Sequence, residues 1–344
     1  MLPIAEHRLP RALSILMLLV AMPAQAERVE PPLELLYAPD NSLVAGPLIE
    51  INPDGRLVFE RKDVLSGKLK PPEHIDVRVP KSALDTVKLG DRYIFGYSML
   101  RPDPRRPTQL TMNPDGAVML VSIGLDPALF RDTPETRAIL KLGRSEHGRE
   151  SRRLFDLLMK SLAGADPALQ RLAAGEIAQE PELGERLRDK DAAAVIETAV
   201  RNVKTPPGVR VTLLVSASHR PSDFGDWWQS AATDVVTSTP IDGYPDRAME
   251  PTDLVLTALE LLDQHAVKLP PDALRRWVRS PNPPLVERAS VMLRRQSPAL
   301  ERSAIQEALA DPTLPETTRK FLGDHLRRLD RLDARSKARK DGTG

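Results

Sequence analysis

The chain has 344 residues, with 49 Lys and Arg against 48 Asp and Glu. This balance argues against nucleic acid as a general partner, because phosphate binding needs clustered positive charge. The length exceeds that of one ordinary domain. The sequence has no cysteine, which excludes disulfides and a lipid attached to an N-terminal cysteine.

Residues 1–26 have the pattern of a cleavable secretory signal peptide. Arg8 and Arg11 precede an apolar run over residues 12–22, and Ala24-Gln25-Ala26 is a small-x-small cleavage site. The run is too short to span a bilayer, which takes roughly 20 residues, although an uncleaved anchor is the alternative. We expect an exported protein that is not an integral membrane protein. The missing disulfides favour a bacterial periplasm over eukaryotic secretion.

Residues 27–130 are predicted to form a β-rich domain. Apolar and β-branched residues predict strands at 33–37 and 43–51, and further alternating segments follow. The tetrapeptide Asn-Pro-Asp-Gly occurs at 52–55 and again at 113–116, and its Pro and Gly are typical of a tight turn between paired strands. Short strands joined in this way favour a small all-β barrel or sandwich.

Residues 131–150 read as a linker or helix, and from there the apolar period changes from 2 to 3.6 over residues 151–332. Proline introduces most of the helices in this region, since its missing N–H and fixed φ suit the first helical position. The predicted helices cover residues 168–179, 209–218, 253–265, 273–279, 285–295, 299–310 and 316–329. The expected fold class is therefore α+β and multidomain.

Several of these openings share the pattern Pro-x-[Leu/Val]-x-Arg, as in Pro167 to Arg171, Pro284 to Arg288 and Pro298 to Arg302. The pattern resembles the first helices of HEAT-type repeats, which begin with Asp-Pro followed by Val or Leu, Arg and a small residue. The resemblance covers residues 150–330 and implies an irregular α-solenoid. The spacing of the openings is uneven, so an irregular helical bundle is the alternative. Stacked helical units leave an extended surface that typically binds proteins or peptides.

Trp227 and Trp228 are the candidate binding residues. Neighbouring side chains on a helix diverge by about 100°, so the two rings cannot share one core stripe. One ring is then available to anchor a peptide or stack on a sugar. The alternative is that one ring packs inside and the other seals the contact with a neighbouring helical unit.

The other polar candidates carry no pattern of a reactive site. His219, Asp223, Asp226 and Asp242 lie close in sequence but match no metal-ligand spacing, and His147 with Glu150 reads as an exposed linker. We expect no catalytic residue, no metal and no cofactor. Residues 333–344 are predicted to be a disordered basic tail, and the segment 327–340 could contact acidic lipids or an acidic partner.

The sequence thus favours a non-enzymatic periplasmic protein that binds a protein or peptide of the cell envelope through its helical surface. Two alternatives stay open: an enzyme or enzyme subunit whose site the sequence does not reveal, and a module that binds carbohydrate or the cell envelope through the tryptophan pair.

Overall fold

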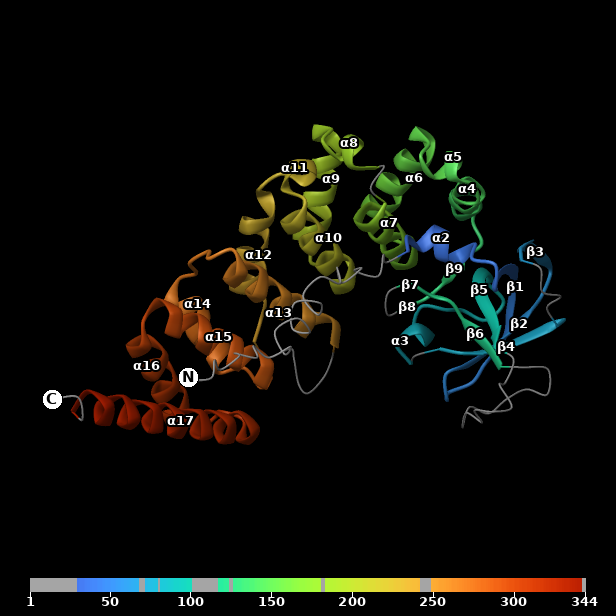
Figure 1. Cartoon of the computed structure of the whole chain (residues 1–344). Helices are drawn as coiled ribbons and strands as arrows, with labels where there is room; N and C mark the ends of the chain where they lie inside the picture. The colour runs from blue at the N-terminus through green and yellow to red at the C-terminus, as the bar shows by residue number, and fades with distance from the viewer. Residues whose placement is uncertain are drawn as a thin grey trace, which may run out of the picture. The chain divides into compact units, whose positions relative to one another are not determined.

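A computed structural model describes residues 30–67, 72–79, 81–100, 117–123, 126–180, 183–241 and 249–341. The chain divides into two compact units, Met1–Glu30 and Pro31–Gly344, and every described helix and strand belongs to the second. In that unit an antiparallel sheet is followed by a helical region (Figure 1). The predicted signal peptide lies outside the described residues. Among the residues described, no helix is both long enough and apolar enough to cross a membrane.

The sheet has the hydrogen-bonded strand order β4-β2-β1-β5-β6, and β3 and β9 pair additionally with β1 and β5. All of its pairings in the described residues are antiparallel. This path ends at β4 and β6 without closing, so the structure shows a sheet and does not show the expected barrel. The strands are β1 (Asn41–Ile51), β2 (Arg56–Glu60), β3 (Asp63–Ser66), β4 (His74–Arg78), β5 (Arg92–Leu100), β6 (Ala117–Leu120) and β9 (Leu129–Arg131). A separate pair joins β7 (Ser122–Ile123) to β8 (Asp126–Pro127).

The first Asn-Pro-Asp-Gly segment forms the predicted hairpin turn between β1 and β2. Asn52 donates its backbone N–H to Arg56 O at 2.8 Å, and Gly55 donates to Asn52 O at 3.0 Å. Gly55 has a φ of 92°, a conformation that L-residues with side chains rarely adopt. The hairpin prediction is confirmed here, whereas the second copy at residues 113–116 lies outside the described residues.

The predicted strand at residues 33–37 is wrong, because this segment forms the short helix α2 (Pro32–Leu36). Pro32 occupies the first helical turn, where the missing N–H costs nothing. Leu33 and Leu36 are both fully buried, and this spacing of three residues places them on one helical face. Another short helix, α3 (Lys81–Leu84), lies between β4 and β5.

The helical region begins directly after β9. Its helices are α4 (Pro134–Gly143), α5 (Glu146–Arg149), α6 (Arg152–Ala163), α7 (Pro167–Gln179), α8 (Gly184–Leu187), α9 (Lys190–Arg201), α10 (Pro207–His219), α11 (Pro221–Phe224), α12 (Trp227–Ser238), α13 (Met249–Gln264), α14 (Pro271–Val278), α15 (Pro283–Gln296), α16 (Pro298–Ala310) and α17 (Glu316–Asp341). The prolines thus locate the starts of most predicted helices. No proline introduces α6 or α9, which were not predicted; their first turns are capped instead by Ser151 and Asp189.

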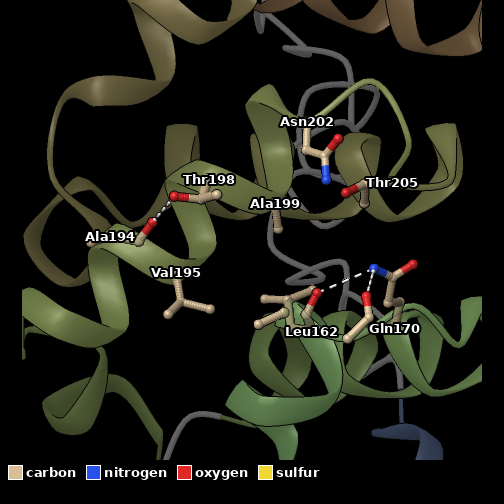
Figure 2. Close-up of a pocket in the computed structure, with 10 residues that line it drawn as sticks. Leu162, Gln170, Ala194, Val195, Thr198, Ala199, Asn202 and Thr205 are labelled. Carbon is tan, nitrogen blue, oxygen red and sulfur yellow. Dashed lines mark hydrogen bonds between the residues drawn. The ribbon is translucent and has the colours of Figure 1, made fainter.

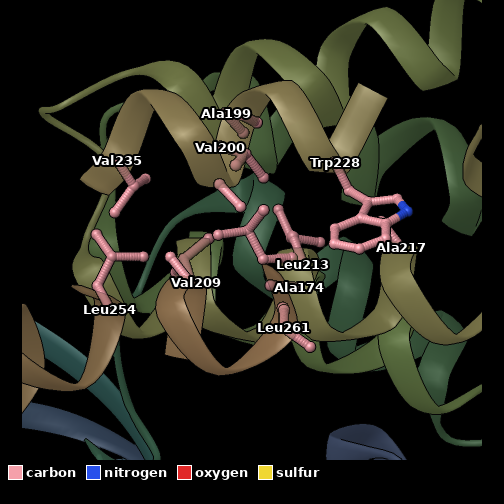
Figure 3. Packing of buried hydrophobic residues seen from close by; sticks show 14 of the residues in the cluster. Ala174, Ala199, Val200, Val209, Leu213, Ala217, Trp228, Val235, Leu254 and Leu261 are labelled. Carbon is pink, nitrogen blue, oxygen red and sulfur yellow. The ribbon is translucent and has the colours of Figure 1, made fainter. Parts of the chain in front are cut away.

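The longer helices pack as successive pairs, which we call the helical array: α6 with α7, α9 with α10, α12 with α13, α14 with α15 and α16 with α17. The second helices of these pairs also contact one another in the order α7, α10, α13, α15 and α17. Figure 3 shows part of the apolar packing between neighbouring pairs, in which Leu213 of α10, Trp228 of α12 and Leu261 of α13 belong to one buried cluster. Packing of each pair against the next agrees with the expected helical region, but it does not by itself identify a HEAT-like repeat.

Arg288 and Arg302, from two of the Pro-x-[Leu/Val]-x-Arg openings, tie their helices to neighbouring elements, and Arg319, which follows Pro315 without the Leu or Val, does the same. The contacts join Arg288 to Glu260 and Asp263 of α13, Arg302 to Asp330 and Asp333 of α17, and Arg319 to the carbonyl oxygens of Leu309 and Asp311. Arg319 therefore satisfies carbonyls at the end of α16 that have no partner within that helix. Arg288 and Arg302 thus each join their helix to two acidic residues of a neighbouring helix.

One hydrophobic core runs from the sheet through the whole helical array. Leu43, Ala45 and Ile94 on one face of the sheet belong to the same buried cluster as Leu322 of α17. Residues that alternate with these along the strands, such as Val44, lie on the opposite face of the sheet and form a separate core. This follows from the two-residue period of a strand. The segment 131–150, expected as a linker or helix, contributes Ile139 and Leu140 of α4 to the shared core.

The C-terminal helix continues beyond the predicted boundary of the tail. α17 extends to Asp341, whereas disorder was expected from residue 333. Asp330 and Asp333 both pair with Arg302 of α16, which holds this part of the helix. The stretch from Glu316 to Asp341 also contains no proline that would break the helix.

Candidate functional site

The two tryptophans at the start of α12 have different environments. Trp228 is 2% exposed and lies in the shared core. Its ring meets the His265 ring edge to face, with 4.7 Å between centroids. This burial gives Trp228 a packing role and leaves no free face for stacking on a sugar.

Trp227 is only partly buried, and its ring packs against the edge of the shared core. Its indole Nε1 donates a hydrogen bond to Phe224 O at 2.7 Å, which fixes the ring beside the preceding turn. The divergence of neighbouring side chains on a helix thus separates the pair as expected, with one ring inside and one at the surface. Of the pair, Trp227 is the residue that a partner can reach.

The polar residues near this turn serve local structure. Asp223 is within salt-bridge distance of both Arg188 and Arg220, at 3.2 Å in each case. Arg220 in turn donates to the carbonyl oxygens of Ile177 and Ala178. No group of metal-ligating side chains occurs within the described parts of the chain, and Asp242 lies outside them. His147 and Glu150 are exposed, as expected.

A pocket of about 230 Å³ opens between the first two helix pairs of the array (Figure 2). Its lining residues come from the ends of α6 and α7, from α9 and from the turn before α10. They are Leu162, Ala163, Gly164, Gln170, Ala194, Val195, Thr198, Ala199, Asn202 and Thr205. Gly164 and the small side chains of Ala163, Ala194 and Ala199 leave the space between these helices unfilled, and none of these residues was predicted to form a site.

The polar atoms around the pocket are held in place by backbone contacts. Gln170 Nε2 donates to Leu162 O and Gly164 O, and Thr198 Oγ1 donates to Ala194 O. Asn202 Oδ1 accepts the N–H of Lys204 and so fixes the turn at the pocket edge. None of the lining residues is titratable, so the pocket offers shape and hydrogen bonding without a group for proton transfer.

An exposed apolar side chain lies next to the pocket. Val203 follows the lining residue Asn202 in the turn between α9 and α10, and it is 80% exposed. Ala194 and Thr198 on α9 are also exposed, so this surface can be reached from solvent. The pocket, Ala194 and Val203 together form what we call the α9 surface.

A buried carboxylate lies elsewhere, where α2 meets the helical array. Glu176 of α7 is 1% exposed, and its Oε1 accepts the backbone N–H of Leu33 at 2.5 Å. Burial raises the pKa of Glu176 to about 7; the hydrogen bond from Leu33 and the charge of Arg149 oppose this rise, while Glu180 and Glu34 add to it. Glu176 does not line the α9 pocket, and its contact with Leu33 indicates a structural role.

The hydrogen bond from the backbone N–H of Leu33 to Glu176 caps the N-terminus of α2. Pro31 at the cap position has no side chain that could accept a hydrogen bond, and Pro32 has no N–H. Leu33 therefore carries the first backbone donor of the helix, and Glu176 accepts it across 143 positions of sequence. No local sequence signal could have revealed this pairing.

No family model, curated protein or solved structure matches the chain. What the chain binds must therefore be inferred from its own geometry.

Proposed function

We propose that the protein is an exported, periplasmic and non-enzymatic interaction protein that binds a protein or peptide of the cell envelope through its HEAT-like helical array. The observation that carries this proposal is the α9 surface, where a pocket without titratable lining residues adjoins the exposed Val203. An apolar anchor residue of a partner seated in such a pocket would account for both features.

The α9 surface can be tested without disturbing the core. Ala194 lines the pocket yet is exposed, so Ala194→Arg blocks the pocket with little effect on folding. Ala310→Arg is the matched control, because it places the same side chain on an exposed alanine of α16. The measurement is affinity capture from an envelope extract, using the chain from Glu27 onward. We expect Ala194→Arg to lose the captured partner by at least about tenfold, as for loss of a central anchor.

Equal capture by the wild type, Ala194→Arg and Ala310→Arg would exclude the α9 surface as the binding site. Thermal unfolding of the three proteins should give similar midpoints, since surface substitutions usually change stability by within about 0.5 kcal/mol. A large loss of stability in Ala194→Arg alone would mean that the position belongs to the packing.

Trp227 is a second candidate contact on the same array. Trp227→Ala should weaken capture and cost less stability than Trp228→Ala, which should cost about 3–5 kcal/mol because a large, fully buried side chain is removed. Thermal unfolding separates the two effects. If Trp227→Ala captures the partner as the wild type does, Trp227 has no binding role.

The proposed export has its own test. Signal-peptide cleavage after Ala26 gives a mature chain that begins at Glu27. N-terminal sequencing of the protein recovered from the periplasm checks this, and recovery of the chain with Met1 retained would contradict it.

A further inference from the structure

The C-terminal part of α17 leaves the packed array and presents a basic face. Among the side chains of α17 that the structure describes, Leu329 is the last buried one, and every residue from Arg331 to Arg335 is exposed. Figure 1 shows α17 as the last helix of the array. The segment therefore lies at a surface although it keeps a regular helical backbone.

The described acidic side chains in the last turns of α17 from Asp324 onward are already paired within the protein. Asp324 pairs with Arg327, and Asp330 and Asp333 both pair with Arg302 of α16. These pairs neutralise the carboxylates that would otherwise balance the basic residues of the helix. The ion pairing thus separates charge across α17, with the carboxylates of residues 330 and 333 turned toward α16.

Arg328, Arg331 and Arg335 remain on the other side of the helix. Their spacing of three and four residues places them within about 60° of one another around the helix axis. All three are exposed, and none has an ion-pair partner among the described residues. We call these arginines, with the exposed Leu332 beside them, the α17 basic face.

We propose that the α17 basic face docks the protein onto anionic lipid headgroups. Guanidinium groups bind phosphate through paired, parallel hydrogen bonds. A straight row of them on a helix surface suits an extended plane of phosphates, and Leu332 adds an apolar contact with the interfacial region of the bilayer. An acidic protein would meet the same charges but does not account for Leu332.

The test compares two variants with equal net charge. Arg328→Glu/Arg331→Glu/Arg335→Glu removes the basic face. Arg131→Glu/Arg144→Glu/Arg153→Glu makes the same change at exposed arginines dispersed over other elements. The chain from Glu27 onward is sedimented with vesicles of phosphatidylcholine alone or mixed with phosphatidylglycerol. Circular dichroism confirms that all variants keep their helical content.

We expect the wild type to bind only the vesicles that contain phosphatidylglycerol, and to bind them more weakly at high salt. The α17 variant should lose at least about tenfold in partitioning, because each surface arginine contributes separately to attraction by anionic lipids. The dispersed variant should retain most of its binding, and an Arg→Lys triple variant at the α17 positions should also bind.

Three outcomes would overturn the proposal: equal wild-type binding to both kinds of vesicle, equal loss in the two charge-reversed variants, and binding to polyglutamate without binding to vesicles. The last would assign the face to an acidic protein. The proposal is independent of the α9 surface, since capture through that surface does not involve these arginines.

Discussion

The two ends of the helical array share one apolar core but differ in the contacts that supplement it. At the first end, α2 packs Pro32 against Gly175 of α7, Leu33 against Gly143 of α4 and Leu36 against Gly96 of β5. At the last end, α17 is fastened to α16 in part by the ion pairs of Arg302. One end depends on close apolar contact, and the other uses charge at the surface.

Gly175 shows how close the first contact is. A Cβ atom at this position would lie 2.6 Å from Pro32 Cγ, nearer than real Cβ contacts allow. Such a close contact fixes the positions of α2 and α7 relative to each other by shape, because close-packed interiors tolerate little change in volume. Exposed ion pairs hold their partners weakly and are screened by salt. The comparison indicates that the sheet is joined firmly to the array, while the far end of α17 is easier to release.

The largest expected loss of stability comes from truncating Leu33, the central side chain in the contact between α2 and its neighbours. Leu33 is fully buried between α4 and α7, so Leu33→Ala should lower the free energy of unfolding by about 2–5 kcal/mol. Urea denaturation measures this change. Leu332→Ala on α17 is the control, since Leu332 is 49% exposed and its loss should cost within about 0.5 kcal/mol. Equal effects of the two substitutions would refute the contrast between the ends.

The second prediction concerns pH. Glu176 has a pKa raised to about 7 in the folded protein, above its ordinary value of 4.5. The folded state therefore binds a proton more tightly than the unfolded state between these values, and this contribution to stability is full below about pH 4.5 and is lost as the pH rises through 7. The size of this change is about 3 kcal/mol, from about 1.4 kcal/mol per pKa unit.

Glu176→Gln keeps an oxygen that can accept the Leu33 N–H and removes the titration. Denaturation of this variant between pH 4.5 and 8 should lack the part of the pH dependence that Glu176 contributes, while Glu150→Gln, at an exposed position, should behave as the wild type. An unchanged pH dependence in Glu176→Gln would show that the buried carboxyl does not titrate in this range.

The smallest effect is expected at the far end of the array. Arg302→Ala removes both ion pairs with α17 and should cost about 0–1 kcal/mol, because the partners Asp330 and Asp333 are largely exposed. Hydrogen exchange should show faster opening of α17 beyond Leu329, with α2 unchanged. High salt should produce the same local change in the wild type. A loss of global stability as large as that of Leu33→Ala would contradict the distinction between the two ends.

Local signals in the sequence predicted much of the fold. Proline at the first helical position located helices such as α7 and α16, and Asn52 to Gly55 formed the expected turn. The segment 33–37 was mispredicted because a short run of apolar residues fits a strand as well as a helix. Only its contacts with α4, α7 and β5 decide between the two.

The candidate sites could be predicted only in part. Helix geometry was enough to separate Trp227 from Trp228, although it could not say which ring was inside. The pocket was not foreseen, because it depends on how far α6 lies from α9. The acceptor role of Glu176 was not foreseen either, since Leu33 is distant in sequence.

The contact between Leu33 and Glu176 also affects the order in which the chain can fold. A growing chain emerges with its N-terminus first. The residues of α2 are therefore made long before α7, whose Glu176 accepts the first backbone N–H of α2. Until residue 176 is available, the buried side chains of α2 and one face of the sheet have no complete partner surface. Long-range contacts of this kind slow folding. A chain that has not yet been made as far as residue 176 therefore cannot bury the side chains of α2 as the folded protein does.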